Sequence, residues 1–179
     1  MASHLRLAPA LGDADLVSSA PLPIRVVLGD YHASMRRSLR RLLDGEEDVE
    51  VVGEADDLAF VEREVRSSQP HVLVLDLGMN GGSTDIKSVT RLRELAPRTM
   101  IVGLTMQDDP VFAQHALEAG AVGFVSKELA DEELGPAIRA AVRGEQFVSP
   151  RVAARLDARH ARTQRGRYET TSREPENSV

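Results

Sequence analysis

The chain contains no cysteine and no tryptophan, and aromatic residues make up only 3% of its 179 positions. The absence of cysteine excludes disulfides, thiolate metal sites and cysteine nucleophiles. No segment approaches the ~18 consecutive apolar residues that a membrane-spanning helix needs. The N-terminal residues also lack the sustained apolar run of a secretory signal. We therefore expect a cytoplasmic protein without a membrane partner, whose core is built from Val, Leu, Ile and Ala.

The net charge of −6 is unevenly distributed along the chain. Residues 151–179 contain seven Arg and four acidic residues, so the part that precedes them is acidic overall. An acidic body is not typical of a nucleic-acid-binding surface. The basic segment is either a solvated tail or a contact for an anionic partner, and we favour the solvated tail.

Composition divides the chain into three parts. Residues 1–23 are rich in Ala, Pro, Ser and Asp, and we interpret them as a flexible N-terminal arm. Residues 24–145 alternate short apolar runs with helical patterns and form the predicted domain. Residues 146–179 begin with one short helical pattern and end in a polar tail without a core-forming period.

Five short apolar runs in the middle part are typical of buried parallel strands, and they cover residues 24–28, 49–55, 71–75, 100–105 and 122–126. Each run is followed by apolar residues at the three- and four-residue spacing of a helix. Asp56 is interpreted as the N-cap of the second helix. Five strand–helix pairs predict an α/β, doubly wound parallel sheet with helices on both faces.

Polar side chains stand where four of these strands end. Asp30 follows the first strand, Asp76 follows the third, Thr105 ends the fourth and Lys127 follows the fifth. Because ligand pockets of such sheets form beyond the carboxyl ends of the strands, we expect these four residues to converge there. Two carboxylates, a hydroxyl and an ammonium group are suited to holding a divalent cation and a phosphoryl group.

The order and spacing of these residues resemble the receiver domain of two-component response regulators. The matching segments are VVLGDYHASMR, HVLVLDLGMNGG, VGLT and GAVGFVSKE, and the resemblance covers about two thirds of the chain. They are most similar to the NarL/FixJ (LuxR-type) branch. The resemblance implies a flavodoxin-like (βα)5 fold, a five-stranded sheet of strand order 2-1-3-4-5.

The resemblance also implies roles for individual residues. Asp76 would be the aspartate that accepts a phosphoryl group. Thr105 and Lys127 would bind that group and report its arrival. Phe124 would be the switch aromatic that moves inward when Thr105 shifts, although a phenylalanine is also an ordinary strand residue.

The metal site departs from the family pattern at one position. The resemblance implies that Mg²⁺ is held by Asp30, by Asp76 and by the main-chain carbonyl of Gly78. Tyr31 stands where the family has a second acidic residue, and a neutral phenol is a poor ligand for Mg²⁺. We therefore expect an atypical pocket with weak or no Mg²⁺-dependent phosphorylation. His32 has no second ligand at a useful spacing, and we expect it only to line the pocket mouth.

The resemblance further implies the partners of the protein. A sensor histidine kinase is the expected phosphodonor, and a homodimer or a heterodimer with another regulator is the expected assembly. Members of this branch bind DNA through a helix-turn-helix output domain and control transcription. Only 34 residues follow Glu145, too few for that domain, so DNA would be reached only through a domain not present in this chain. Either the receiver stands alone or the chain is a truncated form of a longer regulator, and we lean towards truncation.

Two other functions stay open beside the atypical receiver. The first is a conventional phospho-switch, phosphorylated on Asp76 by a sensor histidine kinase. The second is a small enzyme on the same scaffold, such as a flavin carrier or an aspartate-nucleophile phosphatase. A flavin site needs a Ser/Thr-rich phosphate loop after the first strand, and such a phosphatase needs an acid where Gly78 stands. We therefore predict that the protein is not an enzyme.

Overall fold

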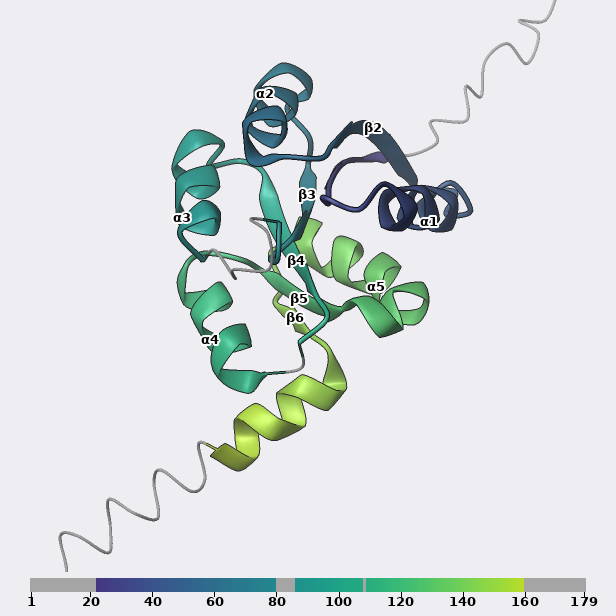
Figure 1. Cartoon of the computed structure of the whole chain (residues 1–179). Coiled ribbons are helices and arrows are strands. Elements are labelled where there is room, and N and C mark those ends of the chain that lie inside the picture. The colour runs from purple at the N-terminus through teal and green to yellow at the C-terminus, as the bar shows by residue number, and fades with distance from the viewer. Residues whose placement is uncertain (1–21, 80–85, 108, 160–179) are drawn as a thin grey trace, which may run out of the picture.

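The computed structural model describes residues 22–79, 86–107 and 109–159. One parallel sheet runs through the middle of the molecule, with α2, α3 and α4 on one face and α1 and α5 on the other (Figure 1). The helices are α1 Ala33–Leu43, α2 Leu58–Ser68, α3 Ile86–Leu95, α4 Pro110–Glu118 and α5 Ala130–Val142. The predicted arm, the glycine-rich segment after Met79 and the polar tail fall largely or wholly outside the described residues.

The sheet has the strand order β2-β1-β3-β4-β5-β6, and all its pairings are parallel. Its strands are β1 Ile24–Gly29, β2 Val49–Ala55, β3 Val72–Asp76, β4 Met100–Thr105, β5 Gly123–Ser126 and β6 Phe147–Val148. The predicted α/β class and the order 2-1-3-4-5 are confirmed. The sixth strand was not predicted, because two residues carry no recognisable apolar period.

Two apolar clusters, one on each face of the sheet, hold the helices in place. The first contains Val61 and Val65 of α2 and the aromatic ring of Phe112 of α4. The second contains Leu39 of α1 and Leu134 of α5. Because β1 and β3 are buried on both faces, side chains at successive strand positions enter alternate clusters. This packing brings the carboxyl ends of β1, β3, β4 and β5 to the same edge of the sheet.

The chain after α5 packs against the sheet. The amide of Phe147 donates to the carbonyl of Val122 at 3.0 Å, and β6 pairs with β5. A helix over residues 150–159 follows. It places Val152 and Leu156 in the first apolar cluster, which lies between the sheet and helices α2, α3 and α4. Ser149, which is fully buried between β6 and this helix, accepts a hydrogen bond from the amide of Ser126 at 3.0 Å. These contacts attach residues 147–159 to the folded body.

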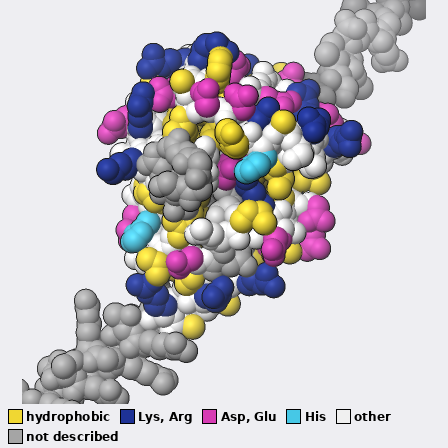
Figure 2. All heavy atoms as spheres, viewed as in Figure 1, with side chains coloured by type: hydrophobic (Ala, Val, Ile, Leu, Met, Phe, Trp, Pro, Cys, Tyr) yellow, Lys and Arg dark blue, Asp and Glu magenta, His cyan; other side chains and the backbone are white. Residues whose placement is uncertain are grey.

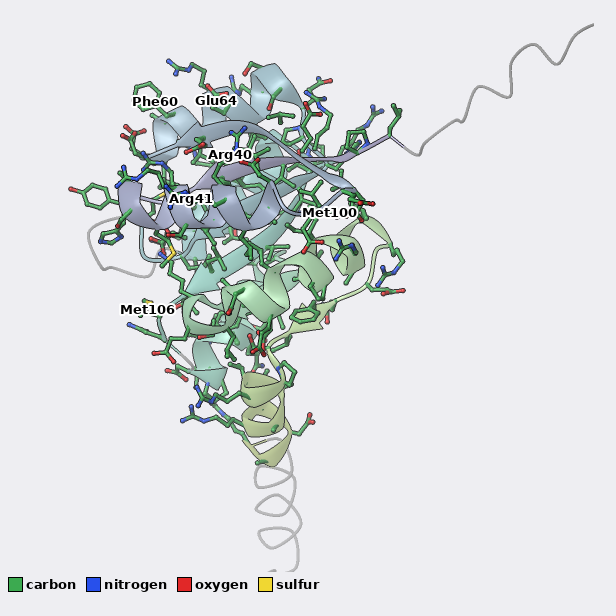
Figure 3. The ribbon with its side chains drawn as sticks, turned by 90° about the vertical axis from the view of Figure 1, so that its right-hand side faces the viewer. Arg40, Arg41, Phe60, Glu64, Met100 and Met106 are labelled. Atoms are coloured by element: carbon green, nitrogen blue, oxygen red, sulfur yellow. The ribbon has the colours of Figure 1, made fainter. Side chains whose placement is uncertain are left out.

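Charged side chains of both signs lie around the rim of the face in Figure 2, and hydrophobic ones lie toward its middle. Figure 3 shows Arg40 on α1. Its guanidinium group pairs with Asp44 at 3.0 Å and with Glu54 of β2 at 3.4 Å. Within the described part of the chain, no helix is long and apolar enough to cross a membrane.

Candidate functional site

Three of the four predicted pocket residues meet in an ion-paired cluster at the carboxyl end of the sheet. The ammonium group of Lys127 lies 2.5 Å from Oδ2 of Asp30 and 3.0 Å from Oδ2 of Asp76. All three side chains are nearly inaccessible, with exposed fractions of 4%, 1% and 6% in that order. One ammonium group therefore faces two buried carboxylates, and the formal charges of these three side chains sum to −1.

Backbone amides hold the second oxygen of each carboxylate. Oδ1 of Asp30 accepts a hydrogen bond from the amide of His32 at 2.7 Å, and Oδ1 of Asp76 accepts one from the amide of Gly78 at 2.9 Å. The guanidinium group of Arg36 donates to the carbonyl of Asp30 at 2.6 Å, which fixes the turn between β1 and α1. These contacts orient both carboxylates before any ligand arrives. Arg36 was missed by the sequence analysis, because an arginine on a basic helix carries no sign of this contact.

Thr105 and Phe124 lie where the sequence predicts, but neither joins the ion-paired cluster. The hydroxyl of Thr105 is buried and accepts a hydrogen bond from the amide of Gln107 at 3.0 Å. Phe124 is fully buried, and its ring packs edge-on against Phe112 of α4 at a centroid distance of 5.9 Å. The ring of Phe124 therefore already points into the core. Met106, directly after β4, is 62% exposed at this edge of the sheet (Figure 3).

The side chains present fit Mg²⁺ poorly. This ion requires near-octahedral coordination by hard oxygen atoms. The side chain of Tyr31 is 63% exposed and packs edge-on against the ring of His32, so it brings no anionic oxygen to the cluster. The pocket is thus left with two carboxylates, those of Asp30 and Asp76, as donors of anionic oxygen. Gly78 lies beside Asp76, to which its amide donates a hydrogen bond, and the role of its carbonyl as a Mg²⁺ ligand stays a prediction.

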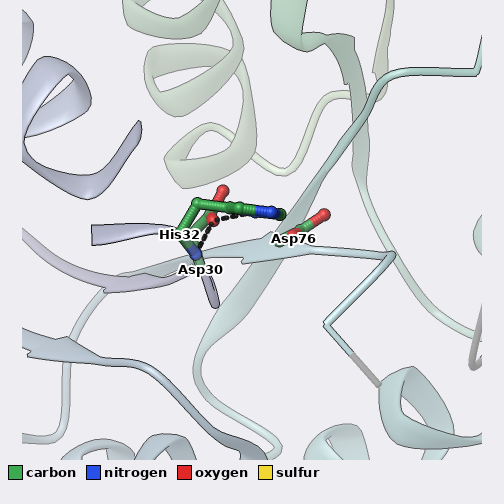
Figure 4. Close-up of side chains that lie close together, drawn as sticks. All are labelled: Asp30, His32 and Asp76. Carbon is green, nitrogen blue, oxygen red and sulfur yellow. Dashed lines mark hydrogen bonds and ion pairs between the residues drawn. The ribbon is translucent and has the colours of Figure 1, made fainter. Parts of the chain in front are cut away.

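The expectation for His32 is wrong in one respect, because the structure does bring it to other potential ligands. Its Nδ1 lies 3.5 Å from Oδ1 of Asp30. One ligand atom each from Asp30, His32 and Asp76 lie within 4.8 Å of one another (Figure 4). The spacing along the sequence did not reveal this group, because Asp76 reaches it from another strand.

The comparisons with known proteins agree with this geometry. The family model for the response regulator receiver domain matches residues 26–139. The chain belongs to the response regulator receiver family. The relatives NreC, NarL and RcsB are response regulators and not enzymes, which favours the receiver function over the enzyme alternatives. Receiver domains typically bind Mg²⁺ for phosphorylation.

Its relatives are response regulators of the NarL/LuxR type. The chain is 34% identical over 133 residues to the oxygen regulatory protein NreC of Staphylococcus carnosus, which covers 74% of this chain and 61% of that relative. A LuxR-family response regulator from Aurantimonas sp. SI85-9A1 is 32% identical, with a TM-score of 0.73 over 78% of this chain and 99% of that one. RcsB, solved as two dimers bound to DNA, is 27% identical, with a TM-score of 0.69 over 75% of this chain and 68% of RcsB. The chain thus spans less than two thirds of the length of NreC.

Proposed function

We propose that this receiver is an atypical one, in which Asp76 is phosphorylated weakly or not at all with Mg²⁺. The observation that supports the proposal is the exposed phenol of Tyr31, which stands where the family has a second carboxylate. The pocket then offers the carboxylates of Asp30 and Asp76, each of which gives one oxygen to Lys127. The loss of one carboxylate removes a ligand and a negative charge that would draw a divalent cation to the pocket.

In the proposed reaction an oxygen of the Asp76 carboxylate attacks the phosphorus of a phosphodonor. An acyl phosphate forms as the bond between phosphorus and the donor breaks. Lys127 then pairs with the phosphoryl oxygens, and the hydroxyl of Thr105 turns from Gln107 towards them. Phe124, packed beside Phe112 of α4, would carry the shift of Thr105 to the surface of the domain. The switch is a population shift between two conformations of the receiver.

The conventional phospho-switch stays the second candidate, because three side chains to which the resemblance assigns roles in the pocket lie together at one edge of the sheet. The ammonium group of Lys127 lies within hydrogen-bonding distance of the carboxylates of both Asp30 and Asp76. Under this alternative, water molecules would supply the missing Mg²⁺ ligand, and a sensor histidine kinase would phosphorylate Asp76 at an ordinary rate. The two candidates differ only in the contribution of Mg²⁺.

The partners proposed for this chain follow from its relatives. RcsB forms dimers on DNA, and we propose that this receiver likewise forms a homodimer or a heterodimer with another regulator. Contact with DNA would require an output domain that the described residues do not contain, and transcription control would be the result. Such a receiver would act in the cytoplasm, where a sensor histidine kinase could reach it.

The proposal is tested by the intact mass of the chain after incubation with acetyl phosphate and Mg²⁺. An ordinary receiver gains one phosphoryl group, about 80 Da. We expect little or no gain for this chain under the same conditions, and none for Asp76→Asn. Asp44→Asn, which changes an exposed aspartate on the far end of α1, serves as the matched control. A full gain that only Asp76→Asn abolishes would establish the conventional phospho-switch instead.

A further inference from the structure

The carboxylates of the pocket share their surroundings with an imidazole. His32 is the N-cap residue of α1, three positions after the end of β1, and its ring extends from beside Asp30 in the direction of Asp76 (Figure 4). Nδ1 of His32 lies 3.5 Å from Oδ1 of Asp30, and a ligand atom of Asp76 completes a group that spans at most 4.8 Å. The site thus offers one nitrogen and two oxygen donors, whereas the position of Tyr31 offers no carboxylate.

We propose that the pocket binds a first-row transition cation of the Zn²⁺ class through Asp30, His32 and Asp76, in preference to Mg²⁺. Imidazole is a good ligand for Zn²⁺ and its neighbours in the periodic table, whereas Mg²⁺ prefers oxygen ligands and retains its water. Three protein ligands and an open position are the arrangement of Zn²⁺ sites that take a further ligand. The inference goes beyond the proposed function and does not require phosphorylation of Asp76.

The distances suit this class of ion. Zn²⁺ binds nitrogen and oxygen atoms at about 2.0–2.2 Å, which places neighbouring ligand atoms about 3–4 Å apart. The 3.5 Å between Nδ1 of His32 and Oδ1 of Asp30 already falls in this range. The ligand atom of Asp76 lies at most 4.8 Å from the other two. The side chain of His32 is 67% exposed, so its ring can rotate towards Asp76 without disturbing the core.

Lys127 does not block this site. A carboxylate has two oxygens with about four lone pairs, and the structure uses only part of them. On Asp30, Lys127 holds Oδ2, whereas the atom nearest the imidazole is Oδ1. On Asp76, Oδ2 faces Lys127, and Oδ1 accepts one amide hydrogen bond. The remaining negative charge of the cluster favours a divalent cation.

The proposal is tested by equilibrium dialysis of the full chain against Zn²⁺ and, separately, against Mg²⁺. We expect Zn²⁺ to bind more tightly than Mg²⁺ by on the order of 100-fold. His32→Ala should weaken the binding of Zn²⁺ by at least about tenfold and leave that of Mg²⁺ unchanged. His115→Ala, which removes another exposed histidine, on α4, is the matched control and should bind both ions as the wild type does. Equal binding of Zn²⁺ by wild type and His32→Ala would overturn the proposal.

Co²⁺ provides a second, spectroscopic measurement. Bound through His32 at a site of low coordination number, it should give the wild type a stronger visible absorption than Co²⁺ in water, and this absorption should fall in His32→Ala. An unchanged spectrum in His32→Ala would contradict the assignment of the imidazole as a ligand. Far-UV circular dichroism checks that each variant is folded. Neither titration contains a phosphodonor, so rapid phosphorylation with Mg²⁺ would refute the proposed function while the effect of His32→Ala on Zn²⁺ remained readable.

Discussion

Shortening the side chain of Val152 to that of alanine tests whether the chain beyond β6 is part of the folded domain. Val152 lies in the helix over residues 150–159, is fully buried and joins the apolar cluster beneath α4. Val152→Ala removes two methyl groups, which costs about 1.6 kcal/mol at roughly 0.8 kcal/mol for each buried carbon. A residual cavity raises the expected loss to about 2 kcal/mol. In a domain of this size, such a loss corresponds to a fall in Tm of roughly 6–8 °C.

The assay is urea unfolding followed by circular dichroism, with a thermal melt as the second measurement. Val142→Ala is the matched control, because Val142 is also helical but is 41% exposed at the end of α5. The gain in helix propensity on changing Val to Ala is similar in both variants, so the difference between them reports burial. If Val152→Ala lost no more stability than Val142→Ala, the helix would not be docked on the sheet.

Two further predictions concern polar contacts. Ser149→Ala should destabilise the fold by about 1–3 kcal/mol in urea unfolding, because the amide of Ser126 and the carboxylate of Glu133 would each lose a buried partner. Arg139→Met should lose about 1 kcal/mol at pH 7, where the guanidinium group of Arg139 lowers the pKa of Asp48 below its ordinary value of 3.8. A group with a lowered folded-state pKa stabilises the fold above its unfolded-state pKa, so the difference between wild type and Arg139→Met should vanish well below pH 3.8.

The controls for these two predictions are other residues with similar side chains. Ser38→Ala removes an exposed hydroxyl on α1 and should change stability by less than about 0.5 kcal/mol. A loss in Ser149→Ala no larger than this would show that the buried hydroxyl contributes nothing. Arg37→Met changes an exposed arginine on α1 and should have no such dependence on pH. A stability difference for Arg139→Met that persisted unchanged at pH 2 would contradict the assignment to Asp48.

The sequence predicts the five main strands and the residues that meet at their ends. Buried runs without alternation indicate parallel strands, and the carboxyl ends of neighbouring parallel strands necessarily lie together. The contact of Lys127 with Asp30 and Asp76 follows from this topology. Local capping was less well predicted, since the N-cap of α2 is Asp57 and not Asp56. Neighbouring aspartates are chemically equivalent, and only the backbone conformation distinguishes them.

Contacts that depend on side-chain orientation could not be predicted from the sequence. The approach of His32 to Asp30 depends on the turn after β1 and on an exposed ring with several possible rotamers. The hydrogen bond from the amide of Gln107 to Thr105 likewise depends on the loop after β4. β6 contains only Phe147 and Val148 and forms because the chain after α5 returns to the open edge of β5.

The central claim, that Tyr31 weakens the pocket, is tested most directly by restoring the carboxylate. The measurement is the rate of phosphorylation of wild type, Tyr31→Asp and Tyr31→Phe by acetyl phosphate across a Mg²⁺ series, followed by intact mass. Loss of even an outer-shell group commonly costs a metal site about 10–100-fold, so Tyr31→Asp should be phosphorylated at least about tenfold faster at limiting Mg²⁺. Tyr31→Phe, which adds no carboxylate, should match the wild type. Equal rates for wild type and Tyr31→Asp at every Mg²⁺ concentration would contradict the account.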